Sequence, residues 1–164
     1  MKRIVPGALI LLFFGFMACN NQDSTISETE KKDLPSENNR SDMNSYISLF
    51  EIPAKDIFRA VSFYQAILDI NIEVVEMPGM EIGVFPYEGQ VVTGVIMKEE
   101  DSRPSADGPT IYLNGGDNLQ TILDKVEKNG GKITVPKTSH ADGNGFFALF
   151  LDTEGNQLGL DSPN

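Results

Sequence analysis

Few residues in this 164-residue chain have the chemistry of an active site, and the sole histidine and one glutamate stand out. His140 lies in the polar segment KTSHADGNG, where a histidine can pass a proton to a bound ligand or can simply be solvated. Glu51 lies in the apolar stretch SLFEIP, where a carboxylate can act as a general base. It can also be a structural group that pairs with Lys55, Arg59 or a lysine of the second half of the chain. Because the only histidine lies in a predicted loop and the only cysteine is expected to carry a lipid, we expect no Ser-His-Asp or Cys-His arrangement.

The first residues have the pattern of an export signal. Lys2 and Arg3 precede an apolar run over residues 4–17, which is too short for a stable membrane span. The run leads into FMAC, which is similar to a bacterial lipobox, the motif at which lipoproteins are cleaved and acylated. We therefore expect residues 1–18 to be a signal peptide and Cys19 to carry a lipid, anchoring the exported chain to a bacterial membrane on its periplasmic or cell-surface face. The alternative is an ordinary secretory signal with a chance cysteine.

The segment 19–44 is polar and almost free of large apolar side chains. It buries too little surface to offset its chain entropy, so we expect a flexible tether, or a disordered arm without a role. Without Lys2 and Arg3 the chain keeps 11 of its 13 basic residues against 24 acidic ones, a net charge of −13. Because no basic cluster is present either, this charge argues against nucleic acid and against broad contact with anionic lipid.

The remaining residues, 45–164, have the length of one domain and contain an internal repeat. Residues 45–98 and 109–162 each read as a strand, a helix and three further strands, separated by a polar linker. Asp56 and Asp117 are the predicted N-caps of the two helices. The first apolar stripe contains Ile57, Ala60, Val61, Tyr64, Ile67 and Leu68; the second contains Leu119, Ile122, Leu123 and Val126.

This pattern predicts an α+β fold of two βαβββ modules. A four-stranded sheet with a single helix buries only one of its faces, so the other face needs a partner. Two such modules with curled, mixed sheets can form a cup between them, and ligands bind in such concave places. The sequence does not decide whether the modules pair within one chain or between the two chains of a homodimer.

Two stretches, LFEIPAKDIFRAVSFYQAILD and DTEGNQLGL, resemble the vicinal oxygen chelate superfamily of glyoxalase I, bleomycin-resistance proteins and extradiol dioxygenases. The resemblance implies the paired βαβββ fold. It also implies that a metal-using member carries His, Glu or Gln ligands on the first and last strand of each module. Counted from the predicted caps, those places fall at Leu49, Thr93 or Val95, Thr110 or Ile111, and Gly159. None of these is a strong donor, so we expect no metal and no cofactor.

Strand alternation indicates which side chains line the cup. We expect an inner face of Leu49, Glu51, Thr93, Thr110, Tyr112, Asn114, Gln157 and Gly159, with Gly159 leaving additional room. The predicted function is that of a metal-free, lipid-anchored protein that binds a small organic ligand in this cup. One alternative is a glyoxalase-like lyase or isomerase that transfers a proton through Glu51 or His140. A weaker alternative is a protein-interaction module.

Overall fold

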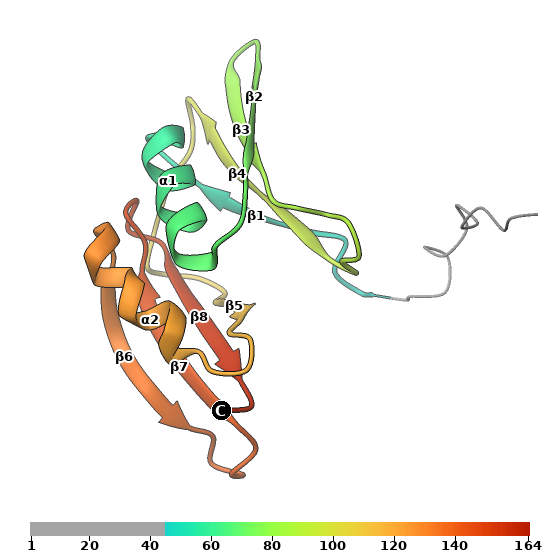
Figure 1. Ribbon diagram of the computed structural model, residues 1–164. Helices are drawn as coiled ribbons and strands as arrows, with labels where there is room; N and C mark the ends of the chain where they lie inside the picture. Colours follow the sequence, from blue (N-terminus) through green and yellow to red (C-terminus); the bar gives the residue numbers. More distant parts are fainter. Residues whose placement is uncertain (1–44) are drawn as a thin grey trace, which may run out of the picture. The chain divides into compact units, whose positions relative to one another are not determined.

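The computed structural model describes residues 45–164, and the predicted signal peptide, Cys19 and the tether lie outside this range. Two four-stranded sheets have the orders β1-β4-β3-β2 and β5-β8-β7-β6 (Figure 1). The strands are β1 (Leu49–Pro53), β2 (Glu73–Met77), β3 (Met80–Val84), β4 (Thr93–Glu99), β5 (Ile111–Asn114), β6 (Lys132–Ser139), β7 (Phe146–Leu151) and β8 (Gln157–Ser162). The helices are α1 (Ile57–Leu68), α2 (Gln120–Val126) and the short 3-10 turn η1 (Glu127–Asn129).

The two sheets have the same topology, which confirms the predicted repeat and the α+β class. In each module the first and last strands are parallel, and the other neighbours are antiparallel. The first strand can lie parallel to the last only because the helix intervenes and returns the chain. As Figure 1 shows, α1 lies along the first sheet and α2 along the second.

Helix α1 begins where the sequence predicts. The Asp56 carboxylate accepts a hydrogen bond from the backbone N–H of Arg59 at 3.0 Å, which satisfies one of the free donors at the helix start. The helix ends at Asp69, which has the left-handed conformation with φ of 54°. The predicted stripe is buried except for Leu68, which is partly buried, and Phe63 is buried in addition.

Helix α2 begins later than predicted, so the assignment of Asp117 as its cap is wrong. The helix starts at Gln120, and the N-cap position is Leu119, whose side chain cannot accept a hydrogen bond. Two other oxygens take that role: Ser162 Oγ accepts from the N–H of Leu119 at 3.1 Å, and Asn118 Oδ1 accepts from that of Gln120 at 3.1 Å. Ser162, 43 residues after Leu119 in the chain, therefore has the capping role that the local sequence pattern predicted for Asp117.

The modules share one hydrophobic core, and α1 contributes to both sides of it. Phe63 lies against Phe150 of the second sheet, with ring centroids 6.1 Å apart. A side chain at Gly131 would place its Cβ within 2.9 Å of the Phe63 ring, so this glycine allows close packing of the two modules. The described domain is therefore held together through its first helix.

The turn DTEGN, between β7 and β8, ties the second module to the start of α1. Glu154 accepts hydrogen bonds from the backbone N–H groups of Lys55 at 2.8 Å and Asp56 at 3.1 Å, and it pairs with Arg59 at 2.7 Å. A carboxylate at a helix N-terminus is stabilised both by these free donors and by the helix dipole. Burial alone would raise the pKa of Glu154, but Arg59 and the two backbone donors outweigh it and lower the pKa.

The same turn contains a buried hydrogen-bond network centred on Asp152. Its carboxylate accepts from Tyr64 Oη at 2.7 Å, from the backbone N–H groups of Glu154 and Asn156, and from Asn156 Nδ2. Burial, followed by the charge of Asp152, raises the pKa of Tyr64 well above its ordinary value of 10.0. Asn156 also donates to the carbonyl of Pro53 at 2.9 Å, which links the turn to the end of β1. The motif is thus structural in this chain.

One face of each sheet packs on its helix, and side chains on the other face are largely exposed. Ile52, Ile96, Leu113 and Leu160 are buried on the helix side, as strand alternation predicts. Leu49 and Tyr112 on the opposite faces are 50% and 48% exposed.

Neither helix within residues 45–164 is long and apolar enough to cross a membrane.

Candidate functional site

The positions that correspond to the family's ligand places can be located from the strand register. Seven residues before the observed N-caps, Asp56 and Leu119, stand Leu49 and Tyr112. Leu49 pairs with Thr93 on β4, and Tyr112 pairs with Gly159 on β8. Counted from the observed start of α2, the second-module position becomes Tyr112 instead of Thr110 or Ile111, and pairing with Leu49 selects Thr93 over Val95. That these are the family's ligand positions stays a prediction.

These four side chains do not suit a divalent cation. Leu49 offers no donor atom, and the Thr93 hydroxyl lies 3.4 Å from the carbonyl oxygens of Phe85 and Pro86, to which it donates. Within residues 45–164, no three His, Cys, Asp or Glu side chains are placed to hold a metal ion together. Since a dication needs several converging imidazole or carboxylate donors, the residues present do not fit the family's metal.

Gly159 does not enlarge the cup, contrary to expectation. A Cβ at this position would lie 2.3 Å from Cδ1 of Tyr112, so the tyrosine ring already covers the glycine. Tyr112 and Gly159 are direct neighbours in the parallel pair of β5 and β8. Because Gly159 has no side chain, the Tyr112 ring can lie over its backbone. At Gly159, the predicted position of a carboxylate ligand, the space is occupied by the Tyr112 ring.

A hollow with a volume of about 400 Å³ lies at the start of β4 in the first module. Thr93, one of the predicted ligand-binding residues, is part of its wall. The other lining residues are Ser45, Ile47, Ser48, Tyr87, Gln90 and Val91. Strand alternation also places Ile47 on the same face as Leu49, as the sequence indicates, and continuing it from Thr93 reaches Val91. Sequence reasoning missed Ser45, Ser48, Tyr87, Gln90 and Val91, and no periodic signal identifies Ser48, Tyr87 or Gln90.

Glu51 is exposed on the open face of the first sheet, next to Val95 on β4. Two of the predicted structural partners are engaged elsewhere: Lys55 donates to the carbonyl of Ser102, and Arg59 pairs with Glu154. The expected ion pair of Glu51 with either residue is therefore wrong, because the DTEGN turn and the linker take both cations.

His140 directly follows β6 and lies beside the open face of the second sheet. Its Nε2 is 2.6 Å from Oδ2 of Asp161, and its ring lies 5.2 Å from that of Phe147. If Nε2 carries the proton donated to Asp161, Nδ1 is left as an acceptor, and the carboxylate fixes the ring orientation. This pair has the geometry of an oriented proton acceptor.

The predicted residues fall into two groups on two sheets. Leu49, Glu51 and Thr93 lie on β1 and β4, whereas Tyr112, Asn114, Gln157 and Gly159 lie on β5 and β8, with Thr110 just before β5. Asn114 Oδ1 accepts from the N–H of Gly116 at 2.8 Å, so its carbonyl oxygen has a structural role. No strand of one described sheet is hydrogen-bonded to a strand of the other.

Paired βαβββ modules, each with a parallel outer strand pair and one open sheet face, define the class of this fold. The model of the Glyoxalase/Bleomycin resistance protein/Dioxygenase superfamily matches residues 46–160, and the chain belongs to this superfamily. A glyoxylase-like domain-containing protein of Didymella fabae is 32% identical over 119 residues, which cover 70% of this chain and 91% of that protein.

Several solved structures share the fold. A glyoxalase I variant from Zea mays has a TM-score of 0.57 at 15% identity; the match covers 71% of this chain, which spans 45% of the maize protein. TnmS3, an antibiotic-binding protein from Streptomyces sp. CB03234, has a TM-score of 0.57 at 20% identity and covers 74% of this chain and 98% of its own. FosX, a fosfomycin resistance protein from Listeria monocytogenes, has a TM-score of 0.55 at 16% identity, with 74% and 96% covered. At these identities the likeness shows the fold alone.

Proposed function

We propose that this chain is a metal-free binding protein for a small, uncharged organic ligand, held at the hollow on the first module. The observation that carries the proposal is the composition of the hollow. Its seven lining residues are serine, threonine, glutamine, tyrosine, isoleucine and valine, and none has an ionic side chain. The chain has 24 acidic residues, yet none of them lines this hollow. A wall without charged side chains suits neutral and partly apolar molecules.

The chemistry of the lining supports a planar, partly apolar ligand with hydrogen-bonding groups. Ile47 and Val91 provide apolar contact, the Tyr87 ring offers a surface for a planar group, and the hydroxyls of Ser45 and Ser48 offer hydrogen bonds. A volume of about 400 Å³ is in the range of small-molecule sites. The antibiotic-binding protein TnmS3, which has the same fold, supports a binding role by analogy.

A thermal-shift screen of the full chain tests this proposal. We expect planar, uncharged organic compounds to raise the melting temperature without added metal, because they stabilise only the folded state. Val91→Arg, which places a charge in the hollow, should abolish the shift. Val75→Arg, on the exposed edge strand β2 of the same sheet, is the matched control and should retain it. Stabilisation by a divalent metal alone, or equal loss in both variants, would contradict the proposal.

A second candidate function is proton transfer, as in a glyoxalase-like lyase or isomerase. The pair of His140 and Asp161 favours it, because an oriented imidazole can take a proton from a ligand bound over the second sheet. His140→Gln should then abolish turnover of a ligand whose thermal shift survives Val91→Arg, while leaving that shift intact. Unchanged turnover in His140→Gln and in Glu51→Gln would leave binding as the function.

The proposed binding site also suggests a role for a second copy of the chain. Leu49 and Tyr112 expose apolar surface on separate sheets, and pairing of modules across a homodimer would cover both faces and enclose the ligand. Sedimentation of the full chain with and without ligand tests this. A dimer that dissociates in Leu49→Glu is expected, and a monomer under all conditions would contradict it.

We further propose that the chain is exported and anchored by a lipid on Cys19. The support is the FMAC motif after the apolar run, which lies outside the described residues. Expression in a bacterium fed a labelled fatty acid should give a labelled membrane protein, and Cys19→Ala should remove the label. Label retained in Cys19→Ala would contradict the anchor.

A further inference from the structure

The loop between β6 and β7 contains the dipeptide Asn144-Gly145, one of three Asn-Gly dipeptides in the chain beside Asn114-Gly115 and Asn129-Gly130. We propose that Asn144 is a site of spontaneous covalent modification, at which the side-chain amide is lost and aspartate or isoaspartate takes the place of asparagine. The reaction needs only the chain itself and water, so this inference does not depend on the proposed function.

The modification is an intramolecular displacement at the side chain of Asn144. The backbone nitrogen of Gly145 forms a bond to Cγ of Asn144, which closes a five-membered succinimide ring, and the bond from Cγ to Nδ2 breaks. The proton given up by the Gly145 N–H leaves with Nδ2 as ammonia. Water then opens one of the two ring carbonyls and yields either aspartate or isoaspartate. Both reacting groups lie in neighbouring residues, which favours the step, and glycine adds no side chain to obstruct it.

The fold protects the other two dipeptides. The N–H of Gly115 donates to the carbonyl of Asp161 at 2.7 Å, and the N–H of Gly130 donates to the carbonyl of Glu127 at 3.2 Å. The asparagine side chains of both dipeptides are held by hydrogen bonds as well. At these two sites the attacking nitrogen and the amide are both fixed, so cyclisation requires local opening of the structure.

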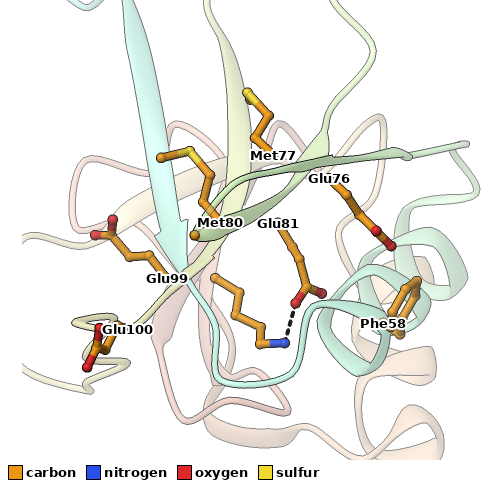
Figure 2. A pocket seen from close by; sticks show the side chains of 9 residues that line it. Phe58, Glu76, Met77, Met80, Glu81, Glu99 and Glu100 are labelled. Atoms are coloured by element: carbon orange, nitrogen blue, oxygen red, sulfur yellow. Dashed lines mark hydrogen bonds and ion pairs between the residues drawn. The ribbon is translucent and has the colours of Figure 1, made fainter.

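A side-chain nucleophile of the same domain shows the same effect of engagement. Lys98 donates to Glu81, its neighbour on β3, and this hydrogen bond raises the pKa of the lysine (Figure 2). At neutral pH the amine therefore stays protonated and has no free electron pair with which to attack. A potential nucleophile that is held by a partner is thus kept from reacting.

Asn144-Gly145 lacks the protection of the other two dipeptides. Among the hydrogen bonds of residues 45–164, none uses the N–H of Gly145, and Asn144 is exposed. Gly145 has the left-handed conformation with φ of 94°, and a Cβ there would lie 2.6 Å from the carbonyl oxygen of Ser162. The backbone therefore requires glycine after this asparagine, which keeps the reactive dipeptide in the loop.

The products would disturb a contact that Asn144 makes within the loop. Asp142 Oδ1 accepts from the backbone N–H of Asn144 at 3.0 Å. Hydrogen bonds from the backbone and then the side chain of Asn144 lower the pKa of Asp142, so this carboxylate is ionised at neutral pH. Loss of the amide places a second carboxylate beside it, and repulsion replaces attraction.

The same loop positions His140. The N–H of His140 donates to the carbonyl of Gly145 at 3.0 Å, and the carbonyl of His140 accepts from the N–H of Gly143 at 3.0 Å. Isoaspartate also lengthens the backbone of the loop by one carbon atom between these contacts. Modification of Asn144 therefore alters the surroundings of the chain's sole histidine.

The test is peptide mapping by mass spectrometry after incubation of the folded full chain at neutral pH. We expect Asn144 to convert at least roughly tenfold faster than Asn114 or Asn129, because those two react only in molecules that have opened locally. In urea, where the protection is lost, the three sites should convert at similar rates. Equal conversion of the three sites in the folded chain, or a folded chain in which Asn144 does not convert, would overturn the proposal.

A second measurement follows the imidazole of His140 by NMR during the same incubation. Because the chain has one histidine, each state of the loop gives its own imidazole signal, and we expect new signals that grow with the conversion of Asn144. Asn144→Gln should keep a single signal, since the longer side chain closes a less favourable ring. Asn129→Gln is the matched control and should behave as the wild type. New signals in Asn144→Gln at the wild-type rate, or an unchanged signal while Asn144 converts, would contradict the proposed effect on His140.

Discussion

At the scale of single residues, Glu154 shows that the DTEGN turn, which forms part of the family resemblance, has a structural role. Its side chain has no exposed surface and accepts hydrogen bonds from two backbone N–H groups and Arg59. The position of Glu154 in a polar turn was evident from the sequence. Its partners were not, because Lys55 and Asp56 lie almost 100 residues away and strand patterns contain no information on such contacts.

The first prediction concerns this carboxylate. Glu154→Gln should lower the free energy of unfolding at pH 7 by about 1 kcal/mol, since a neutral amide binds the helix start and the half-exposed Arg59 less well. The folded state lowers the pKa of Glu154, so its stabilising effect is complete above the ordinary value of 4.5 and is lost as the pH falls below it. Urea unfolding across pH should therefore show the two proteins converging in acid.

The exposed pair of Asp101 and Arg103 provides the control for that experiment. Asp101→Asn should change stability by less than about 0.5 kcal/mol at any pH, because both side chains are largely solvated. A pH-independent difference between Glu154→Gln and the wild type would show that the carboxylate charge is not what stabilises the turn.

The second prediction concerns Gly159, whose neighbour sequence reasoning did not identify. Gly159→Ala should destabilise the fold by roughly 1–3 kcal/mol, because the new Cβ collides with the Tyr112 ring. In a Tyr112→Ala background the same change should cost much less. A double-mutant cycle by chemical unfolding measures the coupling, and additive effects would mean that the ring does not cover the glycine.

At the scale of elements, the two helices differ in how far their starts could be predicted. Asp56 caps α1 through its own side chain, which is a local interaction that the sequence pattern contains. The start of α2 depends on Ser162, a residue of β8, so a local rule placed the start too early. The strands and their alternation were predictable for the same reason as the Asp56 cap, because each depends only on residues close together in the sequence.

The third prediction follows from this difference. Ser162→Ala should destabilise the protein by about 1 kcal/mol, because the N–H of Leu119 loses its acceptor in a buried place. Asp117→Ala, at the cap position suggested by the sequence, should stay within about 0.5 kcal/mol of the wild type. Thermal unfolding measures both, and the reverse order of effects would contradict the observed start of α2.

At the scale of the whole molecule, the fold and its repeat were predictable because each module repeats one pattern of strands and one helix. The relation between the modules was not, since it rests on Phe63 against Phe150 and on the DTEGN turn. The hollow of the proposed function could not be predicted from the sequence either. Its wall combines the residues before β1 with the turn before β4, which are far apart in the chain. A family resemblance locates the ligand places, but the side chains present decide the chemistry.

The central claim is that a member of this superfamily binds its ligand without a metal at the positions of Leu49, Thr93, Tyr112 and Gly159. The most direct measurement is a calorimetric titration of the chelator-treated full chain with zinc and nickel ions. We predict no stoichiometric binding that depends on these positions, because they offer one hydroxyl and one phenol and no carboxylate or imidazole. One tightly bound ion per chain, lost in Thr93→Val or Tyr112→Phe, would contradict the account.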